Sequence, residues 1–476
     1  MRSVFMISIA LLLISCAVGR DYQRPGLDIP SRWRFAEKDA QSPVNAKWWE
    51  QFGDPVLNEL IESALKENVD VGIAAARIEE YGGRYVIARG DLFPKMSAVG
   101  SGTRQRVTEE GLTAVPSGVP NPYPTYQAYF NASWEIDLWG KLRRSTEAAR
   151  ADLLSMEHAH HAVGLSLTAS VARAYIDLLD YDRQLVIARE TLRTRERSLE
   201  IFKMRFDAGV ISELELSQVL SEYESARAMM PQIEKNIASQ EHAINLLLGR
   251  NPGPVARGLS IDELKLPVVP AGLPSDLLER RPDILQAEQS LIAANARIGV
   301  AKAAFFPSIS LTGMLGNASV DLTRLFTGPA LIWNAGAALT LPVFTAGRTW
   351  GQVKASTALQ KQALLNYQKT IQTAFREVED SLADQNLTRV KLDAQYKQMT
   401  ALRNYRDLAL LRYENGYSSY LEVLDAQRNL FNMELNYIQT RGGLFHALIN
   451  LYQAMGGGWV PEENNPKAEL SEEKKE

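Results

Sequence analysis

The amino-acid sequence predicts an α+β membrane protein in which short groups of strands alternate with very long helices. Three features support this fold class: an internal duplication, strand segments in which apolar and polar residues alternate, and helical tracts without prolines. The same order of strands and helices occurs twice along the chain, so the two halves are expected to fold alike.

The duplication is visible in three pairs of similar segments, at an offset of roughly 210 residues. ARGDLFPKMSAVG (88–100) parallels AKAAFFPSISLTG (301–313), NASWEIDLWGKLRRSTEAARADL (131–153) parallels AALTLPVFTAGRTWGQVKASTAL (337–359), and RFDAGVISELELSQ (205–218) parallels RYENGYSSYLEVLDAQ (412–427).

Composition excludes several classes of protein. The 476-residue chain has a net charge of −4 and a pI of about 5.9, which gives no indication of nucleic-acid binding. Beyond the N-terminus no apolar run approaches the roughly 20 residues of a membrane-spanning helix, so any membrane crossing is expected to use strands. The sequence contains no P-loop, no G-x-S-x-G and no H-E-x-x-H motif, which argues against an enzyme.

The N-terminus has the pattern of a secretory signal, with a positive charge at Arg2 and an apolar core at 4–14. The end of this core, LISC (13–16), resembles a bacterial lipobox. Cleavage there makes Cys16, the one cysteine of the chain, the mature N-terminus. Cys16 is then expected to carry an N-acyl chain and a diacylglycerol lipid, with no other cofactor. Because Ala17 is not an aspartate, the resemblance directs the lipoprotein to the outer membrane. The alternative is an ordinary signal peptide with an incidental cysteine.

Residues 126–138 alternate with nearly perfect period two, over a length greater than that of most soluble strands. The apolar positions are Tyr126, Ala128, Phe130, Ala132, Trp134, Ile136 and Leu138, and the positions between them are mostly polar. This length fits the roughly 9–11 residues of a tilted membrane strand with one lipid face and one wet face. The alternative is a half-buried sheet in a soluble protein.

Further strands are expected after Pro94, around 309–315 and at 333–341. Four strands cannot close a membrane barrel, which needs about eight, and an open sheet edge is not tolerated in lipid. The strands are therefore expected to be shared among subunits, with the loops 105–125 and 317–328 as hairpin tips.

Helices account for most of the remaining chain. An amphipathic helix is expected over about 54–88, followed later by a very long helix at 142–207 with only Gly164 as an interior breaker. That long helix would be on the order of 100 Å in length, which is typical of coiled coils and helical repeats. It returns as a second helix at about 212–248, which Pro231 is expected to kink or break.

The second repeat has the same pair of helices, predicted at about 347–415 and 418–455. In each repeat the long helix ends at a glycine, Gly209 or Gly416, as expected for a residue that terminates a helix. These two glycines are the predicted tips of the helical hairpins.

Five parts of the sequence are characteristic: LLERRPDILQAEQSLIAANARIGVAKAAFFPSISLTG (277–313), SWEIDLWGKLRR (133–144), RYENGYSSYLEVLDAQR (412–428), the lipobox and the DYQRP after it. They resemble the outer-membrane factors of tripartite efflux pumps, the TolC-like family, and the resemblance covers essentially the whole mature chain. It implies a homotrimer in which each chain gives four strands to a 12-stranded outer-membrane β-barrel. That barrel would be continuous with a long α-helical periplasmic barrel.

The resemblance also implies function, location and partners. The expected function is passive conduction from periplasm to exterior through a gated tunnel, as the channel component of an RND-type pump in a Gram-negative outer membrane. The expected partners are a periplasmic adaptor (membrane fusion) protein, an inner-membrane RND-type pump and outer-membrane lipid, with no nucleic acid. The alternatives are a periplasmic coiled-coil scaffold or adaptor, and the exit duct of a protein secretion system.

Six consecutive segments are expected on this basis. They are a lipoprotein signal peptide (1–15), a lipidated arm (16–53), the first repeat (54–250), a proline-rich equatorial insert (251–282), the second repeat (283–457) and a charged C-terminal tail (458–476). Each repeat is expected to hold a helix, a β-hairpin and a long helical hairpin.

The resemblance places a gate at the periplasmic tip of the second hairpin. Its residues are Tyr413, Leu421, Glu422 and Asp425, beside Gly416. Around a threefold axis, Leu421 would form an apolar constriction and Asp425 a ring of carboxylates. The equivalent positions of the first repeat are Phe206, Leu214 and Gln218, which lack the acid, so we expect only the second hairpin to swing. The alternative for Asp425 is a solvated helix residue.

Two acidic residues, Glu135 and Asp137, lie on the polar side of the strand pattern and are expected to line the pore. Their alternative role is in a strand-to-helix turn or helix cap. Trp134, Trp139 and Trp333 are candidates for interfacial aromatic girdles.

His158, His160 and His161 form the one histidine cluster of the sequence. His158 and His161 share a helix face, but no carboxylate or cysteine lies at a third-ligand spacing. No metal site is predicted.

Overall fold

The computed structural model describes residues 17–26, 29–35, 47–108, 110, 118, 120–267 and 274–457. The predicted signal peptide, Cys16 and the C-terminal tail lie outside the described residues. The chain forms two compact units. The first unit comprises the described parts of Met1–Gly26, Arg77–Glu157 and Gln286–Tyr367, and the second those of Leu27–Ala76, His158–Leu285 and Gln368–Glu476. Each unit therefore draws on both sequence repeats.

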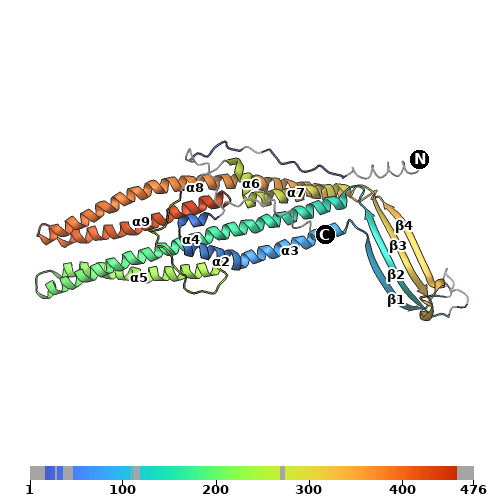
Figure 1. Cartoon of the computed structure of the whole chain (residues 1–476), viewed down its shortest axis with the longest axis horizontal. Helices are drawn as coiled ribbons and strands as arrows, with labels where there is room; N and C mark the ends of the chain where they lie inside the picture. The colour runs from blue at the N-terminus through green and yellow to red at the C-terminus, as the bar shows by residue number, and fades with distance from the viewer. Residues whose placement is uncertain are drawn as a thin grey trace. The chain divides into compact units, whose positions relative to one another are not determined.

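The order of the α-helices and strands is the same in the two halves, as the labels in Figure 1 show. The elements of the first half are η1 (Trp48–Phe52), α2 (Pro55–Glu67), α3 (Val69–Gly90), β1 (Lys95–Gln105), β2 (Tyr123–Ile136), α4 (Lys141–Asp207) and α5 (Glu213–Leu247). Those of the second half are η2 (Pro274–Asp276), α6 (Leu277–Arg280), α7 (Pro282–Ala303), β3 (Ser308–Ser319), η3 (Leu322–Arg324), η4 (Gly328–Ala330), β4 (Leu331–Thr340), α8 (Arg348–Glu414) and α9 (Tyr420–Ala454).

The four strands of the first unit form one antiparallel sheet in the order β1-β2-β3-β4. The register joins the two repeats, because β2 of the first repeat pairs with β3 of the second. One row across the sheet runs Ala98, Phe130, Leu315 and Trp333, and the row beside it runs Ser97, Asn131, Met314 and Asn334. The side chains of Phe130, Leu315 and Trp333 are all more than half exposed. The alternation in the sequence therefore becomes one apolar and one mostly polar face.

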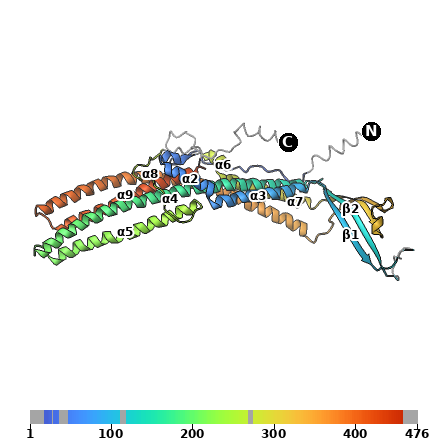
Figure 2. The same ribbon diagram turned by 60° about the horizontal axis from the view of Figure 1, so that its bottom comes forward.

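Two helical hairpins, α4–α5 and α8–α9, lie mostly in the second unit, and the beginnings of α4 and α8 belong to the first. The helices of each hairpin run side by side (Figure 1, Figure 2). The long helices α4 and α8 have 67 residues each, and the return helices α5 and α9 have 35 each. Gly209 and Gly416 follow the long helices with φ values of 71° and 76°. This left-handed conformation is favourable for glycine and reverses the chain.

The core of the second unit is aromatic and lies where the return helix α9 ends. Trp48 stacks on Tyr452 with ring centroids 4.8 Å apart, and Phe52 contacts Phe445 edge-on at 5.5 Å. All four rings are almost completely buried. The proline-rich insert adds buried Val255, Ile261 and Leu264 to this cluster.

Two helix predictions need correction. Residues 54–88 form two helices, because Asn68 is extended and its side-chain Oδ1 accepts the N–H groups of Asp70 and Val71, capping α3. Pro231 does not break α5, which continues through it. Proline leaves the Arg227 carbonyl without its helical donor, and both residues are exposed, so water can satisfy that carbonyl.

Within the described residues, α4 holds a stretch that is long and apolar enough to cross a membrane, with a mean hydropathy of 1.3 over 18 residues. More than half of that stretch, 56%, is buried inside the protein. Its apolar character fits a core helix of the second unit.

Candidate gate at the tips of the helical hairpins

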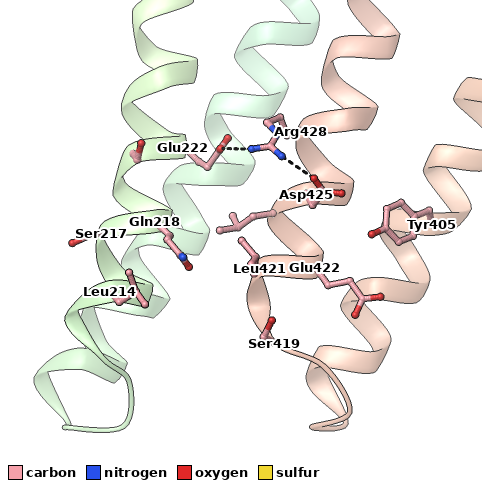
Figure 3. Close-up of a pocket in the computed structure, with 12 residues that line it drawn as sticks. Leu214, Ser217, Gln218, Glu222, Tyr405, Ser419, Leu421, Glu422, Asp425 and Arg428 are labelled. Carbon is pink, nitrogen blue, oxygen red and sulfur yellow. Dashed lines mark hydrogen bonds and ion pairs between the residues drawn. The ribbon is translucent and has the colours of Figure 1, made fainter.

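A groove of about 760 Å³ lies between the return helices near the hairpin tips (Figure 3). Residues of α5 form one wall, and residues of α9 with Tyr405 of α8 form the other. The lining residues are Leu214, Ser217, Gln218, Ser221, Glu222, Tyr405, Ser419, Leu421, Glu422, Leu424, Asp425 and Arg428. The groove therefore separates the first hairpin from the second.

The two walls begin with different helix caps. At the start of α5, the Ser212 hydroxyl accepts the Glu215 N–H at 3.3 Å, and the Glu215 carboxylate accepts the Ser212 N–H at 2.9 Å. This capping box satisfies two N–H groups that a helix start leaves unpaired. Ser419 occupies the same position before α9 but makes no side-chain capping bond. The start of α9 therefore lacks the side-chain cap of α5, and its first turns are held by the buried Tyr420, Val423 and Leu424.

A chain of alternating charges crosses the groove. Arg428 donates to Asp425 on its own helix at 2.7 Å and lies 3.9 Å from the Glu222 carboxylate on α5 (Figure 3). Glu222 also pairs with Arg195 of α4 at 3.0 Å. We call these four residues, Arg195, Glu222, Arg428 and Asp425, the tip network. It connects α4 and α5 of the first hairpin with α9 of the second.

Arg195 is the buried anchor of the tip network, with 5% of its surface exposed. Burial lowers the pKa of Arg195, and the Glu222 carboxylate counteracts that effect. The guanidinium also donates to the Glu222 carbonyl at 2.6 Å and lies over the Phe431 ring at 5.6 Å. A buried guanidinium needs such partners, whereas Arg428 at the other end is half exposed. The exposed end of the network is thus the end that can be broken at low cost.

Three of the four predicted gate residues, Leu421, Glu422 and Asp425, line this groove. Leu421 is 56% exposed although it is apolar. The Asp425 carboxylate accepts hydrogen bonds from Arg428 and from the Asn429 side chain at 3.0 Å, so it is a paired residue and not merely a solvated one. Glu422 lies 3.6 Å from Arg412 of α8.

Leu214 and Gln218, the first-repeat equivalents, lie on the opposite wall of the same groove. Tyr413 lies elsewhere. Its hydroxyl accepts a hydrogen bond from Arg205 at 2.6 Å, and its ring contacts Tyr420 at 5.0 Å. Burial raises the pKa of Tyr420, which packs in this aromatic group. Tyr413 therefore joins the two hairpins beside the groove.

The predicted pore residues lie in the first unit, at the junction of β2 and α4. Glu135 is the penultimate residue of β2, and its carboxylate pairs with Lys141 at 3.1 Å. Asp137 follows the end of the strand, and its carboxylate accepts the N–H groups of Leu142 and Arg143 at 3.1 and 2.9 Å. The interpretation of Asp137 as a residue of the wet strand face is therefore wrong. It is a cap of α4, because the free N–H groups of a helix start attract a carboxylate.

The histidine cluster lies on α4, where His160 and His161 have ring centroids 5.8 Å apart. Across the residues that the structure describes, no group of three or more His, Cys, Asp or Glu side chains is arranged to hold a metal ion.

Arg195, Glu222 and Arg428 were missed by the sequence-based prediction. The duplication aligns Asp425 with Gln218 and Arg428 with Ser221, so it indicates no charge on the first return helix at these positions. A search of the first return helix for an acidic residue near the position equivalent to Arg428 would have found Glu222, one residue after Ser221.

Comparison with known proteins gives one consistent result. The sequence matches the family "Outer membrane efflux protein" over residues 60–250 and 273–457. It is 38% identical to the toluene efflux pump outer membrane protein TtgC of Pseudomonas putida, with 98% of this chain and 97% of TtgC aligned. It is 35% identical to the cation efflux system protein CusC of Escherichia coli, with 95% and 97% of the two chains aligned.

The fold resembles solved outer-membrane channels. The CmeC channel of Campylobacter jejuni superimposes with a TM-score of 0.90 at 26% identity, over 97% of this chain and 98% of CmeC. This match confirms the predicted fold class, in which strands and long helical hairpins form one chain.

Proposed function

The chain belongs to the outer membrane efflux protein family, and from this premise we propose how three copies of it form a tunnel and how its residues close that tunnel. The protein is the outer-membrane channel component of a tripartite efflux pump of a Gram-negative bacterium, and it is not an enzyme. The scaffold and protein-secretion alternatives have no support among these relatives.

The proposal of a homotrimer rests on the open edges of the sheet. Its outer strands, β1 and β4, have no partner on one side within the described residues. An apolar row of exposed side chains crosses all four strands, and an open edge beside such a face is not tolerated in lipid. Three copies supply 12 strands, in which β4 of one chain pairs with β1 of the next.

Cross-linking across that seam tests the trimer. Cysteines introduced in pairs at β1 and β4 positions should give a trimer band on gels, and heating should change its mobility. Cysteine pairs on β2 and β3 are the control and should cross-link only within one chain. Dimers or larger ladders in place of trimers would contradict the proposal.

The tip network is the proposed lock of the gate. It joins α9 to the first hairpin through Arg428, so release of Arg428 from Glu222 frees the start of the uncapped return helix. Leu421, exposed on the same wall, then moves away from the axis together with Asp425. The first hairpin keeps its capping box and remains in place.

Arg428→Ala tests this lock by single-channel conductance. We expect the variant to open more often than the wild type, because one ion pair and one bridging contact across the groove are lost. Arg403→Ala is the matched control, since Arg403 pairs with Glu434 at 2.9 Å and thereby joins α8 to α9 within one hairpin. Equal conductance of the wild type and the Arg428 variant, or an equal rise in both variants, would refute the lock.

The adaptor protein is proposed to dock on the hairpin tips. Val210 and Tyr417, which follow the two tip glycines, have 71% and 79% of their surfaces exposed although their side chains are largely apolar. Val210→Asp and Tyr417→Asp should reduce co-purification of the adaptor and of the RND-type pump, whereas Leu246→Asp, an exposed position at the far end of α5, should not. Unchanged recovery with both tip variants would exclude this surface.

The lipid is proposed to be attached at Cys16, which lies outside the described residues. The arm that follows it is tied to the first unit: the Val18 N–H donates to the Trp139 carbonyl at 2.9 Å, and Asp21 pairs with Arg144 at 2.6 Å. Arg24 pairs with Glu288 of α7 at 2.5 Å. The first two contacts hold the chain next to the junction of β2 and α4, where strands meet helices. Mass spectrometry of the mature N-terminus should find an acylated Cys16, and a mature chain beginning elsewhere would exclude it.

The cargo is proposed to be organic compounds such as solvents and antibiotics. The support is the toluene efflux relative, which is aligned over nearly the whole chain at a slightly higher identity than the cation efflux relative. A deletion strain should become sensitive to solvents, detergents and antibiotics but not to Cu or Ag. Sensitivity confined to metals would overturn this assignment and make His158 and His161 the first residues to mutate.

A further inference from the structure

A half-buried polar seam between α4 and α9 lies in the second unit, away from the tip groove. The two helices run antiparallel there and are neighbours in both views (Figure 1, Figure 2). Arg173 donates to the side chains of Asn450 and Gln453 at 2.8 and 2.9 Å. One turn further along α4, Asp177 lies 3.0 Å from Nε2 of His446.

Asp180 is the next residue of this seam, and its buried carboxylate is not fully hydrogen-bonded. Its Oδ1 atom is buried and has no hydrogen-bond partner among the described residues. Its carboxyl group faces Gly442 of α9, so that a Cβ at Gly442 would lie 3.7 Å from it. Asp177, one turn away, adds a negative charge. Two acids therefore share an interface with one histidine.

The charged groups around Asp180 come from α4 and α9. The pKa of Asp180 is raised to about 6, mainly by burial; a hydrogen bond from Gln184 lowers it, the charge of Asp177 raises it and the charge of His446 lowers it. Tyr181 lies near the same two acids. Arg441 of α9 turns away, to the Ile261 and Asp262 carbonyls, and Gln240 of α5 donates to the Ala174 carbonyl.

We propose that Asp180, with Asp177 one turn away on α4 and Gly442 opposite on α9, forms a proton-operated latch that holds α4 and α9 together more firmly in acid. Protonation of Asp180 removes a buried charge, on a carboxylate whose Oδ1 atom has no hydrogen-bond partner among the described residues, and it removes the repulsion with Asp177. Both effects favour the packed state of the two helices.

The direction of the pH dependence follows from the linkage between protonation of Asp180 and packing of the two helices. The pKa of Asp180 is higher in the packed state than the ordinary value of about 3.9 that it regains when the helices part. Its contribution to packing is therefore fully present below about pH 4 and is lost as the pH rises through about 6. The latch tightens on acidification over this window.

Two glycines make α9 a suitable element for such a device. Gly442 and Gly443 lie together inside the helix, where each costs on the order of 1 kcal/mol relative to alanine. A Cβ at Gly442 would touch Asp180, whereas a Cβ at Gly443 would meet nothing within 4 Å. The helix is thus weak next to the latch, directly before the aromatic core residue Phe445.

Hydrogen exchange of the full-length protein in detergent tests the latch. In the wild type, opening of α9 around His446, corrected for intrinsic exchange rates, should rise by up to about tenfold between pH 5 and pH 7. Asp180→Asn should exchange slowly at both pH values. Asp393→Asn, which removes an exposed carboxylate paired with Lys397 on α8, is the control and should keep the wild-type dependence. A wild-type pH dependence in Asp180→Asn would overturn the proposal.

A second pair of variants keeps the test valid if Asp180→Asn does not fold. Gly442→Ala and Gly443→Ala raise helix propensity equally, but only the first places a methyl group on the Asp180 carboxyl. Gly442→Ala should shift the pH midpoint of opening upward, and Gly443→Ala should leave it unchanged. Equal midpoints in the two variants would refute the latch. None of these measurements depends on the gate, so the latch and the gate can fail separately.

Discussion

The two return helices, α5 and α9, have the same length and the same place in their repeats but differ in what holds them. Nineteen residues of α9 are buried and only five of α5. Conversely, α5 starts with a capping box, whereas α9 starts without a side-chain cap. The start of α5 is held by a side-chain cap and that helix lies mostly at the surface of the chain, whereas α9 is held along its length by buried residues, which include Tyr420, Val423 and Leu424 in its first two turns. The two copies of the hairpin therefore differ in how the return helix is held.

The largest effect expected from this difference is at the core end of α9. Phe445 is fully buried against Phe52, and Phe445→Ala should reduce the free energy of unfolding by about 3–5 kcal/mol. The aligned residue of α5 is Ala238, where Ala238→Gly should cost about 1 kcal/mol through helix propensity. Denaturant unfolding of the purified protein measures both. Equal losses in the two variants would mean that the return helices are anchored alike.

A smaller effect is expected at the groove. Leu421→Ala and Asp425→Ala should each raise channel opening by roughly fivefold to tenfold, corresponding to about 1 kcal/mol, because the partly exposed Asp425 pair contributes modestly. Leu214→Ala and Gln218→Ala on the opposite wall should change it little, since α5 is held by its cap. Single-channel recordings make the comparison directly. If the first-repeat variants open the channel equally, both hairpins move.

The smallest effect is expected at the caps. Ser212→Ala should destabilise the start of α5 by about 1 kcal/mol, because its hydroxyl accepts the Glu215 N–H. Ser419→Ala removes no capping bond and should change the start of α9 by only a few tenths of that amount. Hydrogen exchange of the first turn of each helix reports both values. A larger loss at Ser419 would show that α9 is capped in solution.

Acidification should affect the two return helices differently, because Asp180, whose pKa is raised, packs against α9. Peptides of α9 near His446 should become better protected below pH 6, while peptides of α5 near Lys235 should not respond. An equal change of protection in both helices would mean that the pH dependence belongs to the whole protein and not to the polar seam.

Much of the fold could be read from local patterns. Period-two alternation in 126–138 predicted a strand that the structure places at Tyr123–Ile136, and the proline-free tract from 142 predicted α4. Both patterns are local, because alternation and helical periodicity depend on neighbours in the chain. The same reasoning failed at Pro231, where exposure lets water replace the lost hydrogen bond, and at Asn68, whose side chain starts a new helix.

The site was only partly predictable. Leu421 and Asp425 were identified through a family resemblance, and the structure places both on one groove wall. The role of Arg428 depends on its contact with Glu222, and that contact joins residues about 200 positions apart in sequence. The role of Asp137 depended on where β2 ends, since a shift of one or two residues turns a strand position into a helix cap.

The sequence by itself determined the duplication, the strands, the long hairpins and the turn glycines, because each follows from composition and spacing over a few turns of chain. Only the tertiary structure decided which hairpin is anchored and which charges meet. Arg195, Glu222, Arg428 and Asp425 come from three helices, and Asp180 and His446 from two. Burial and ion pairing depend on contacts between helices, so the tip network and the polar seam exist only after the helices have packed.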